Sequence, residues 1–272
     1  MTRVRDRLHA LSPAERRLAE FVLDFPGDLA SYSATELARL ANVSNATVTR
    51  FVRSVGYQSF DEARQKVRAE RGGGAALFMV SAASDSDGDA AAAHFKQAQA
   101  NLSRTVNTLS LSEIDEIAAA MLAAPRVWVI GFRAGRPLAE YFQWQALQVL
   151  PAVRIVPGAG ETLAEHIADA REDDCALVIG LRRRTKTMRS ALAFLAEAKV
   201  SIAYLTDGAE AAPPGVSWQL RCQTAAPGPL FNHVAPLALL HLLATRIVER
   251  SGTAGRRRLA TVEAAHATLD EL

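Results

Sequence analysis

Short apolar runs alternate with helical segments from residue 126 onwards, and this alternation constrains the fold more than any other feature of the chain. The runs are rich in β-branched residues and have the length of buried strands. They comprise Arg126–Gly131, Ala152–Val156, Cys175–Gly180, Val200–Leu205 and a weaker fifth at 216–220. The segments between them have helical patterns at 136–150, 161–170 and 185–198. Because strands joined by crossover helices run parallel, the sequence predicts an open, mostly parallel, doubly wound α/β sheet.

Helix-start signals dominate the first seventy residues. Ser12, Ser33 and Ser59 are each followed three residues later by a glutamate, which is the pattern of a capping box. Apolar residues then recur at helical spacing, as in the segment 18–25. These signals predict an all-α domain at the start of the chain.

Small and acidic residues fill the stretch from Gly72 to Asp89, a composition typical of a linker. Two further helices are predicted after it, at 90–109 and 112–123, ahead of the first strand. The expected domains are therefore a helical domain at 1–71, a linker at 72–89 and an α/β domain at 90–272.

The third predicted helix of the first domain begins at Ser44, directly after Asn42-Val43, and ends at Gly56. So short a connection predicts a tight helix-turn-helix. One face of this helix is apolar, whereas the opposite stripe carries amide, hydroxyl and guanidinium groups that suit base edges and phosphates. The candidate DNA-binding residues are Thr35, Ser44, Asn45, Thr47, Thr49, Arg50 and Arg53. Such a stripe also suits the solvated face of a surface helix, but the cap, the turn and the lack of acids together favour DNA.

Three segments of this domain resemble the amino-terminal domain of MurR/RpiR-type bacterial transcription regulators. They are Leu11–Glu20, Ala41–Phe51 and Gly56–Phe60. That family couples the domain to a sugar isomerase (SIS) domain that senses a phosphorylated sugar or a related metabolite. The predicted α/β domain resembles a SIS domain over essentially its whole length, so the resemblance implies an effector sensor at 90–272.

Two loops at predicted strand ends are strongly basic. Gly131–Pro137 and Gly180–Lys186 carry six cations and no acid, at positions where parallel sheets bind ligands and helix N-termini attract anions. Guanidinium groups favour phosphate or carboxylate, so we expect an anionic small-molecule pocket. The candidate ligand-binding residues are Arg133, Gly135, Arg136, Arg182, Arg184, Thr185 and Lys186.

The same loops depart from the SIS pattern, which has Gly-x-Gly-x-Ser in the first loop and Ser-x-Ser-Gly-x-Thr in the second. In the first loop, Arg133 stands in place of a glycine and Gly135 in place of a serine. In the second, Gly180, Arg182 and Arg183 replace Ser, Ser and Gly, and Thr185 alone matches. Three interpretations stay open: a rebuilt anion pocket, a pocket filled by its own side chains, and a solvated surface.

The net charge and the number of cysteines exclude several further classes of protein. The net charge is +2, so affinity for a polyanion must come from local clusters. Cys175 and Cys222 lie too far apart for a disulfide framework or a four-ligand zinc site, which favours a reducing cytoplasm. The start of the chain lacks the apolar run of a secretory signal, and we expect no membrane span and no metal. Glu161 and His166 form a candidate acid–base pair, but a helix-start acid and a surface or core histidine are the simpler interpretation.

Taken together, these features predict a cytoplasmic, ligand-responsive DNA-binding regulator that has no cofactor and catalyses no reaction. Its expected partners are double-stranded operator DNA, an anionic effector and a second copy of the chain. The helix predicted at 234–244 is apolar nearly all round, so either the domain core or a subunit interface must cover it. The alternatives are a SIS-fold sugar-phosphate isomerase and a regulator with a vestigial ligand site.

Overall fold

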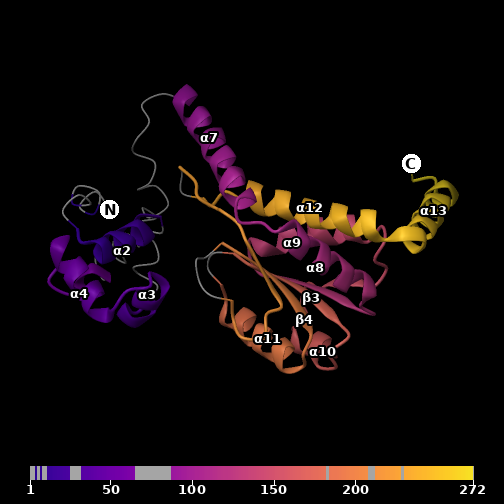
Figure 1. The fold of residues 1–272 in the computed structure, drawn as a ribbon, viewed down its shortest axis with the longest axis horizontal. Helices are drawn as coiled ribbons and strands as arrows, with labels where there is room; N and C mark the ends of the chain where they lie inside the picture. Colours follow the sequence, from indigo (N-terminus) through magenta and orange to yellow (C-terminus); the bar gives the residue numbers. More distant parts are fainter. Residues whose placement is uncertain are drawn as a thin grey trace. The chain divides into compact units, whose positions relative to one another are not determined.

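The computed structural model describes residues 11–24, 32–64, 87–181, 184–207, 212–227 and 230–271, together with Val4 and Arg7. The chain folds into two compact units (Figure 1). The first comprises residues 1–97 and 225–231, and the second comprises residues 98–224 and 232–272. Residues 72–86 of the predicted linker, as well as Arg182 and Arg183, lie outside the described residues.

The first unit is helical, as the sequence predicts. Its helices α2, α3 and α4 span Pro13–Asp24, Ala34–Leu40 and Asn45–Ser54. Ser33 and Glu36 form the predicted capping box at the start of α3, where each side chain bonds the backbone of the other. The apolar residues of α4, with Phe51 at their centre, pack against α2 and α3 in one buried core.

The second unit contains the predicted α/β alternation. Its helices are α7 (Asp87–Val106, which begins in the first unit), α8 (Leu111–Ala123), α9 (Gly135–Ala146), α10 (Ala164–Ile167), α11 (Lys186–Glu197), α12 (Val234–Arg250) and α13 (Gly252–Leu269). Its strands are β1 (Val127–Gly131), β2 (Val153–Ile155), β3 (Cys175–Gly180), β4 (Ser201–Thr206) and β5 (Trp218–Arg221). The helix expected over 161–170 is reduced to α10, because Gly158 and Gly160 lie in a loop that the side chain of Glu161 closes.

All five strands are parallel, in the order β2-β1-β3-β4-β5. Helices α8, α9 and α12 cover one face of the sheet, and α10 and α11 cover the other (Figure 1). Alternate residues of each strand enter the two cores, as Val129 and Ile130 do in β1. The doubly wound α/β fold is thereby confirmed.

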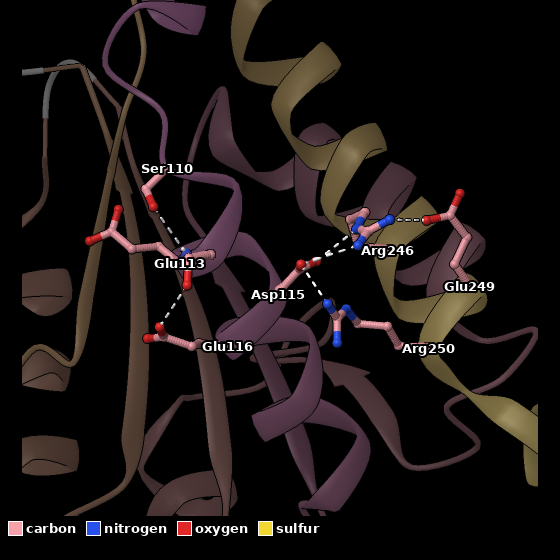
Figure 2. Close-up of polar contacts among 8 residues, drawn as sticks. Ser110, Glu113, Asp115, Glu116, Arg246, Glu249 and Arg250 are labelled. Atoms are coloured by element: carbon pink, nitrogen blue, oxygen red, sulfur yellow. Dashed lines mark hydrogen bonds and ion pairs between the residues drawn. The ribbon is translucent and has the colours of Figure 1, made fainter.

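An ion-pair cluster joins α8 to α12 on one side of the sheet (Figure 2). Asp115 of α8 accepts hydrogen bonds from Arg246 Nε at 2.7 Å and from Arg250 Nη2 at 2.5 Å. Arg246 also contacts Glu249 one turn further along α12. These hydrogen bonds, chiefly the one from Arg246 and then the one from Arg250, lower the pKa of Asp115 to about 2 from its ordinary value of 3.8.

The low pKa of Asp115 predicts a pH-dependent contribution to stability. Because the folded state binds this proton less tightly than the unfolded state, the contribution is present above pH 4 and is lost as the pH falls towards 2. We expect Asp115→Asn to lower the melting temperature at pH 7. The difference from wild type should shrink between pH 4 and pH 2, and a difference that stays constant over that range would contradict the assignment. Thermal melts across the range measure it.

Candidate DNA-reading helix and candidate effector site

Helix α4 begins with a side-chain cap. The Ser44 hydroxyl accepts a hydrogen bond from the Thr47 amide at 3.2 Å, and the two hydroxyls lie 2.9 Å apart. Thr47, one of the predicted DNA-binding residues, is buried. The reason is local, because a residue at the third position of a capped helix turns its side chain towards the cap. Thr47 is thus absent from the exposed stripe.

The exposed stripe of α4 consists of Asn45, Thr49 and Arg53, with Arg50 beside it, and all four side chains are exposed. The first three recur every fourth residue and so share one side of the helix. Asn45 Nδ2 lies 3.4 Å from the hydroxyl of Thr35 on α3, so the predicted contact residue of α3 adjoins the stripe. Since α4 contains no acid, the stripe offers donors and cations to a polyanion.

Residues flanking α4 fix its position. Asn42, in the turn from α3, has φ 51°, a left-handed conformation that asparagine tolerates well. Gly56 follows the helix with φ 90°, as its predicted place after the helix requires. Arg7, which the sequence analysis missed, donates to the carbonyl of Ser54 at 2.5 Å. A cation is favourable at this end of a helix, but nothing in the local pattern around Arg7 indicates the contact.

The two basic loops lie side by side at the carboxyl edge of the sheet. They follow β1 and β3, which are neighbouring strands at the point where the strand order reverses. Ligands of open α/β sheets bind in this crevice. A Cβ on Gly131 would lie 2.3 Å from the carbonyl oxygen of Gly135, and one on Gly135 would lie 3.0 Å from that of Ile179. Gly131 is therefore required where backbone packs on backbone, and a side chain at Gly135 would be tightly packed against Ile179.

The cations of these loops differ in their surroundings. Arg133 is exposed, with φ 55°, and Lys186 is exposed at the start of α11. Arg136 donates to Glu140 Oε1 at 2.8 Å and also to the carbonyl of Pro157 in the loop after β2. The hydroxyl of Thr185 caps α11 by accepting from the Met188 amide at 3.1 Å. In this state, Arg133 and Lys186 are the most accessible of the described loop cations.

Arg184 is held inside the protein. Its Nε donates to the Gly180 carbonyl at 2.7 Å, and its Nη2 donates to the Thr206 hydroxyl at 2.6 Å and to Asp207 Oδ1 at 2.9 Å. The Asp207 side chain is 0% exposed and that of Arg184 is 17% exposed. Asp207 Oδ2 in turn accepts from the Thr224 hydroxyl at 2.8 Å. The contacts of Arg184 thus connect the ends of β3, β4 and β5.

Glu161 and His166 do lie together, in the loop after β2. Glu161 Oε2 is 2.7 Å from His166 Nε2 and accepts from the Gly158 amide at 2.7 Å. The amide of Gly158, and then His166, lower the pKa of the Glu161 carboxyl. A carboxylate with a lowered pKa that is already engaged by two donors is a poor proton acceptor.

The described residues give little support for thiol chemistry or for a metal site. Burial raises the pKa of the Cys175 thiol to about 12 and also raises that of Cys222, so both remain protonated. Within the ranges given above, no three or more His, Cys, Asp or Glu side chains are grouped to hold a metal ion. No helix in that part of the chain is long and apolar enough to cross a membrane.

Comparisons with known proteins bear on both units. Residues 1–71 match the model of the helix-turn-helix domain of the rpiR family, and residues 121–246 match that of the SIS domain. The HTH-type transcriptional regulator HexR of Pseudomonas aeruginosa is 27% identical over 259 residues, which cover 93% of this chain and 90% of HexR.

Two solved structures share the fold. The sugar isomerase domain of an RpiR transcription factor from Sphaerobacter thermophilus has a TM-score of 0.57 and 24% identity, covering 62% of this chain and 96% of that one. The Vibrio vulnificus NanR protein, solved in complex with ManNAc-6P, has a TM-score of 0.60 and 19% identity, covering 98% of both chains. With its helix-turn-helix domain followed by a SIS domain, the chain belongs to the RpiR-type transcriptional regulators.

Proposed function

We propose that this regulator binds operator DNA through α4 and senses an anionic metabolite at the carboxyl edge of its sheet. The proposed effector site rests on one observation: the two basic loops follow β1 and β3, which are neighbouring strands where the strand order reverses. The effector is a sugar phosphate or another phosphate or carboxylate compound. ManNAc-6P in the Vibrio vulnificus NanR complex is an example of this class in a protein of similar fold. We propose a cytoplasmic location for the same reason, because operator DNA is found there.

The proposed mechanism is thermodynamic linkage. An effector that binds two arrangements of the regulator unequally shifts their populations, and thereby the affinity for the operator, by its differential affinity. We assign no catalytic role, because Glu161 is engaged by Gly158 and His166 and no second acid–base pair lies beside it among the described residues of the loop.

Arg50 and Arg53 test the position of the DNA-reading surface. We expect Arg50→Ala and Arg53→Ala each to weaken binding by about 1–3 kcal/mol, because each removes a cation from phosphate or a base edge. The probe is a duplex that the wild-type protein selects from a random library, titrated by fluorescence anisotropy at several salt concentrations. Arg189→Ala, which removes an exposed cation from α11, is the control and should leave affinity unchanged. Undiminished binding in both α4 variants would contradict this position of the surface.

A thermal-shift panel tests the effector site. It compares sugar phosphates with the matching neutral sugars, unphosphorylated sugar acids and inorganic phosphate. One class of anion at 100 times its dissociation constant should stabilise the protein by about 2.7 kcal/mol. The stabilisation should fall in Arg133→Ala and persist in Arg189→Ala. If no compound exceeds the inorganic phosphate control, the site is vestigial and the proposal of an effector fails.

A further inference from the structure

Tyr204 of β4 fills the space that Gly180, at the end of β3, leaves without a side chain. Tyr204 lies opposite Val178 in the sheet, so its ring can reach Gly180 two residues further along the same face of β3. A Cβ on Gly180 would lie 2.3 Å from Cε2 of the ring and 2.4 Å from its hydroxyl oxygen. The SIS pattern has a serine in place of Gly180. The hydroxyl of Tyr204 therefore lies close to where the hydroxyl of such a serine would project.

The ring of Tyr204 is packed in the core, but its hydroxyl has no partner there. The residue is 4% exposed and lies in the core between the sheet and α11, together with Met188. No hydrogen bond joins the hydroxyl to any residue that the structure describes. A buried phenol hydroxyl ordinarily has a partner, because a buried polar group that is left unpaired destabilises the fold. A phenylalanine would fill the same space without that cost, so packing alone does not account for the hydroxyl.

The loop that starts at Gly180 favours an anion. It leads into α11, whose first turn contains Lys186 and no acid. Amide groups at the start of a helix attract negative charge, and the hydroxyl of Thr185 occupies one of them, that of Met188. A phosphate group has several acceptor oxygens, so it can accept from such amides and from a phenol hydroxyl at once. The hydroxyl of Tyr204 is thus a neutral donor at the edge of a positively charged loop.

We propose that Tyr204 is a ligand-binding residue of the effector site, where its hydroxyl donates a hydrogen bond to a phosphate group of the effector. This inference rests on the proposed function, because it places the anion at the loop after β3. Tyr204 supplies from the neighbouring strand a hydroxyl that the loop does not contain at position 180, and Gly180 leaves room for it. Tyr204 was not among the predicted site residues, because it lies inside an apolar run that predicts only a buried strand.

The variant Tyr204→Phe tests the inference, because it removes the hydroxyl and keeps the ring. The probe is inorganic phosphate, titrated against the full chain at constant ionic strength and followed by thermal shift. We expect the dissociation constant for phosphate to rise by about tenfold or more, because a hydrogen bond to a charged group is lost. Without phosphate, the melting temperature should equal or exceed that of wild type, since an unpaired polar atom has been removed. Tyr141→Phe is the matched control, because it removes a phenol hydroxyl that is bonded to His241 instead, and it should bind phosphate as wild type does.

A second experiment moves the hydroxyl into the loop. Tyr204→Leu keeps an apolar side chain in the core and vacates the space beside Gly180. Gly180→Ser in the Tyr204→Leu background then places a hydroxyl at position 180, and we expect this double variant to bind phosphate more tightly than Tyr204→Leu alone. Gly180→Ser by itself should lower the melting temperature, because its Cβ collides with the ring of Tyr204. Circular dichroism confirms that each variant is folded.

Four results would overturn the inference. They are a wild-type protein that phosphate does not stabilise, undiminished phosphate affinity in Tyr204→Phe, an equal loss in Tyr141→Phe, and a Tyr204→Phe variant that is less stable than wild type without phosphate. The last result would show that the hydroxyl has a partner inside the protein. The proposed effector fails separately, if no compound of the panel stabilises the protein more than inorganic phosphate does. The phosphate titration of Tyr204→Phe still decides the role of Tyr204 in that case.

Discussion

Replacing Asp207 with alanine is expected to lower the free energy of unfolding of the SIS domain by about 3–5 kcal/mol. The Asp207 side chain is fully buried, and its removal takes away the carboxylate that pairs with the guanidinium of Arg184 and accepts from the hydroxyl of Thr224. Removing one partner of a buried ion pair costs more than the pair contributes, because the other charge stays desolvated. Since Arg184 is 17% exposed, we expect the lower end of that range.

The chain contains a matched control for this experiment. Asp169 pairs with Arg126 at 2.9 Å, the same distance as Asp207 from Arg184, but the Asp169 side chain is 66% exposed. Asp169→Ala should therefore lower the free energy of unfolding much less than Asp207→Ala does. Urea unfolding of both variants measures the difference. Equal losses would show that burial does not distinguish the two ion pairs and would contradict the internal role of Asp207.

Phe51→Ala is expected to unfold the helix-turn-helix domain and to abolish DNA binding. Truncating a fully buried phenylalanine costs about 3–5 kcal/mol, and Phe51 is among the largest fully buried side chains of the chain. A domain of about seventy residues has little stability beyond this, because a small domain buries a smaller fraction of its surface. Circular dichroism of the variant and the wild-type chain measures the effect as a loss of helical signal.

Arg53, two residues further along α4, provides the contrast. Its side chain is exposed, so Arg53→Ala should change stability by no more than about 0.5 kcal/mol while weakening DNA binding. The two variants thus separate the fold of the domain from its contact with DNA. Phe51→Ala with an unchanged unfolding free energy would contradict the packing of α4 against α2 and α3.

The strands were predictable from the sequence because both faces of the sheet are buried. A strand such as β3 must then be apolar throughout, and its predicted and observed limits coincide at Cys175 and Gly180. The capped helices were also predictable, because a cap is a pattern of residues that are close together in the sequence. Helix α13 was not predicted, because Gly255 alone is buried among its described residues and the helix has no apolar stripe to mark it.

The partners of the loop arginines were beyond sequence reasoning. Arg184 and Asp207 lie 23 positions apart and meet because β3 and β4 are neighbours, with Gly180 opposite Thr206. Arg136 reaches Pro157 because β1 and β2 are neighbours. The residue types predicted cations at this edge, but the sequence contains no signal for the direction of a long flexible side chain. Only the assembled sheet distinguishes exposed Arg133 from Arg184.

The internal contacts of Arg184 impose a selection on any small molecule that uses this arginine. Asp207 is an intramolecular competitor, so the apparent dissociation constant equals the intrinsic one divided by the fraction of molecules in which Arg184 is released. Weak acceptors such as sugar hydroxyls cannot displace a buried carboxylate, whereas a doubly charged phosphate offers comparable attraction. Since the Thr224 carbonyl also accepts from the amide of Asn232, just ahead of α12, the same exchange would relax the start of that helix. The Arg184–Asp207 ion pair would then determine both which ligands bind and how binding affects the start of α12.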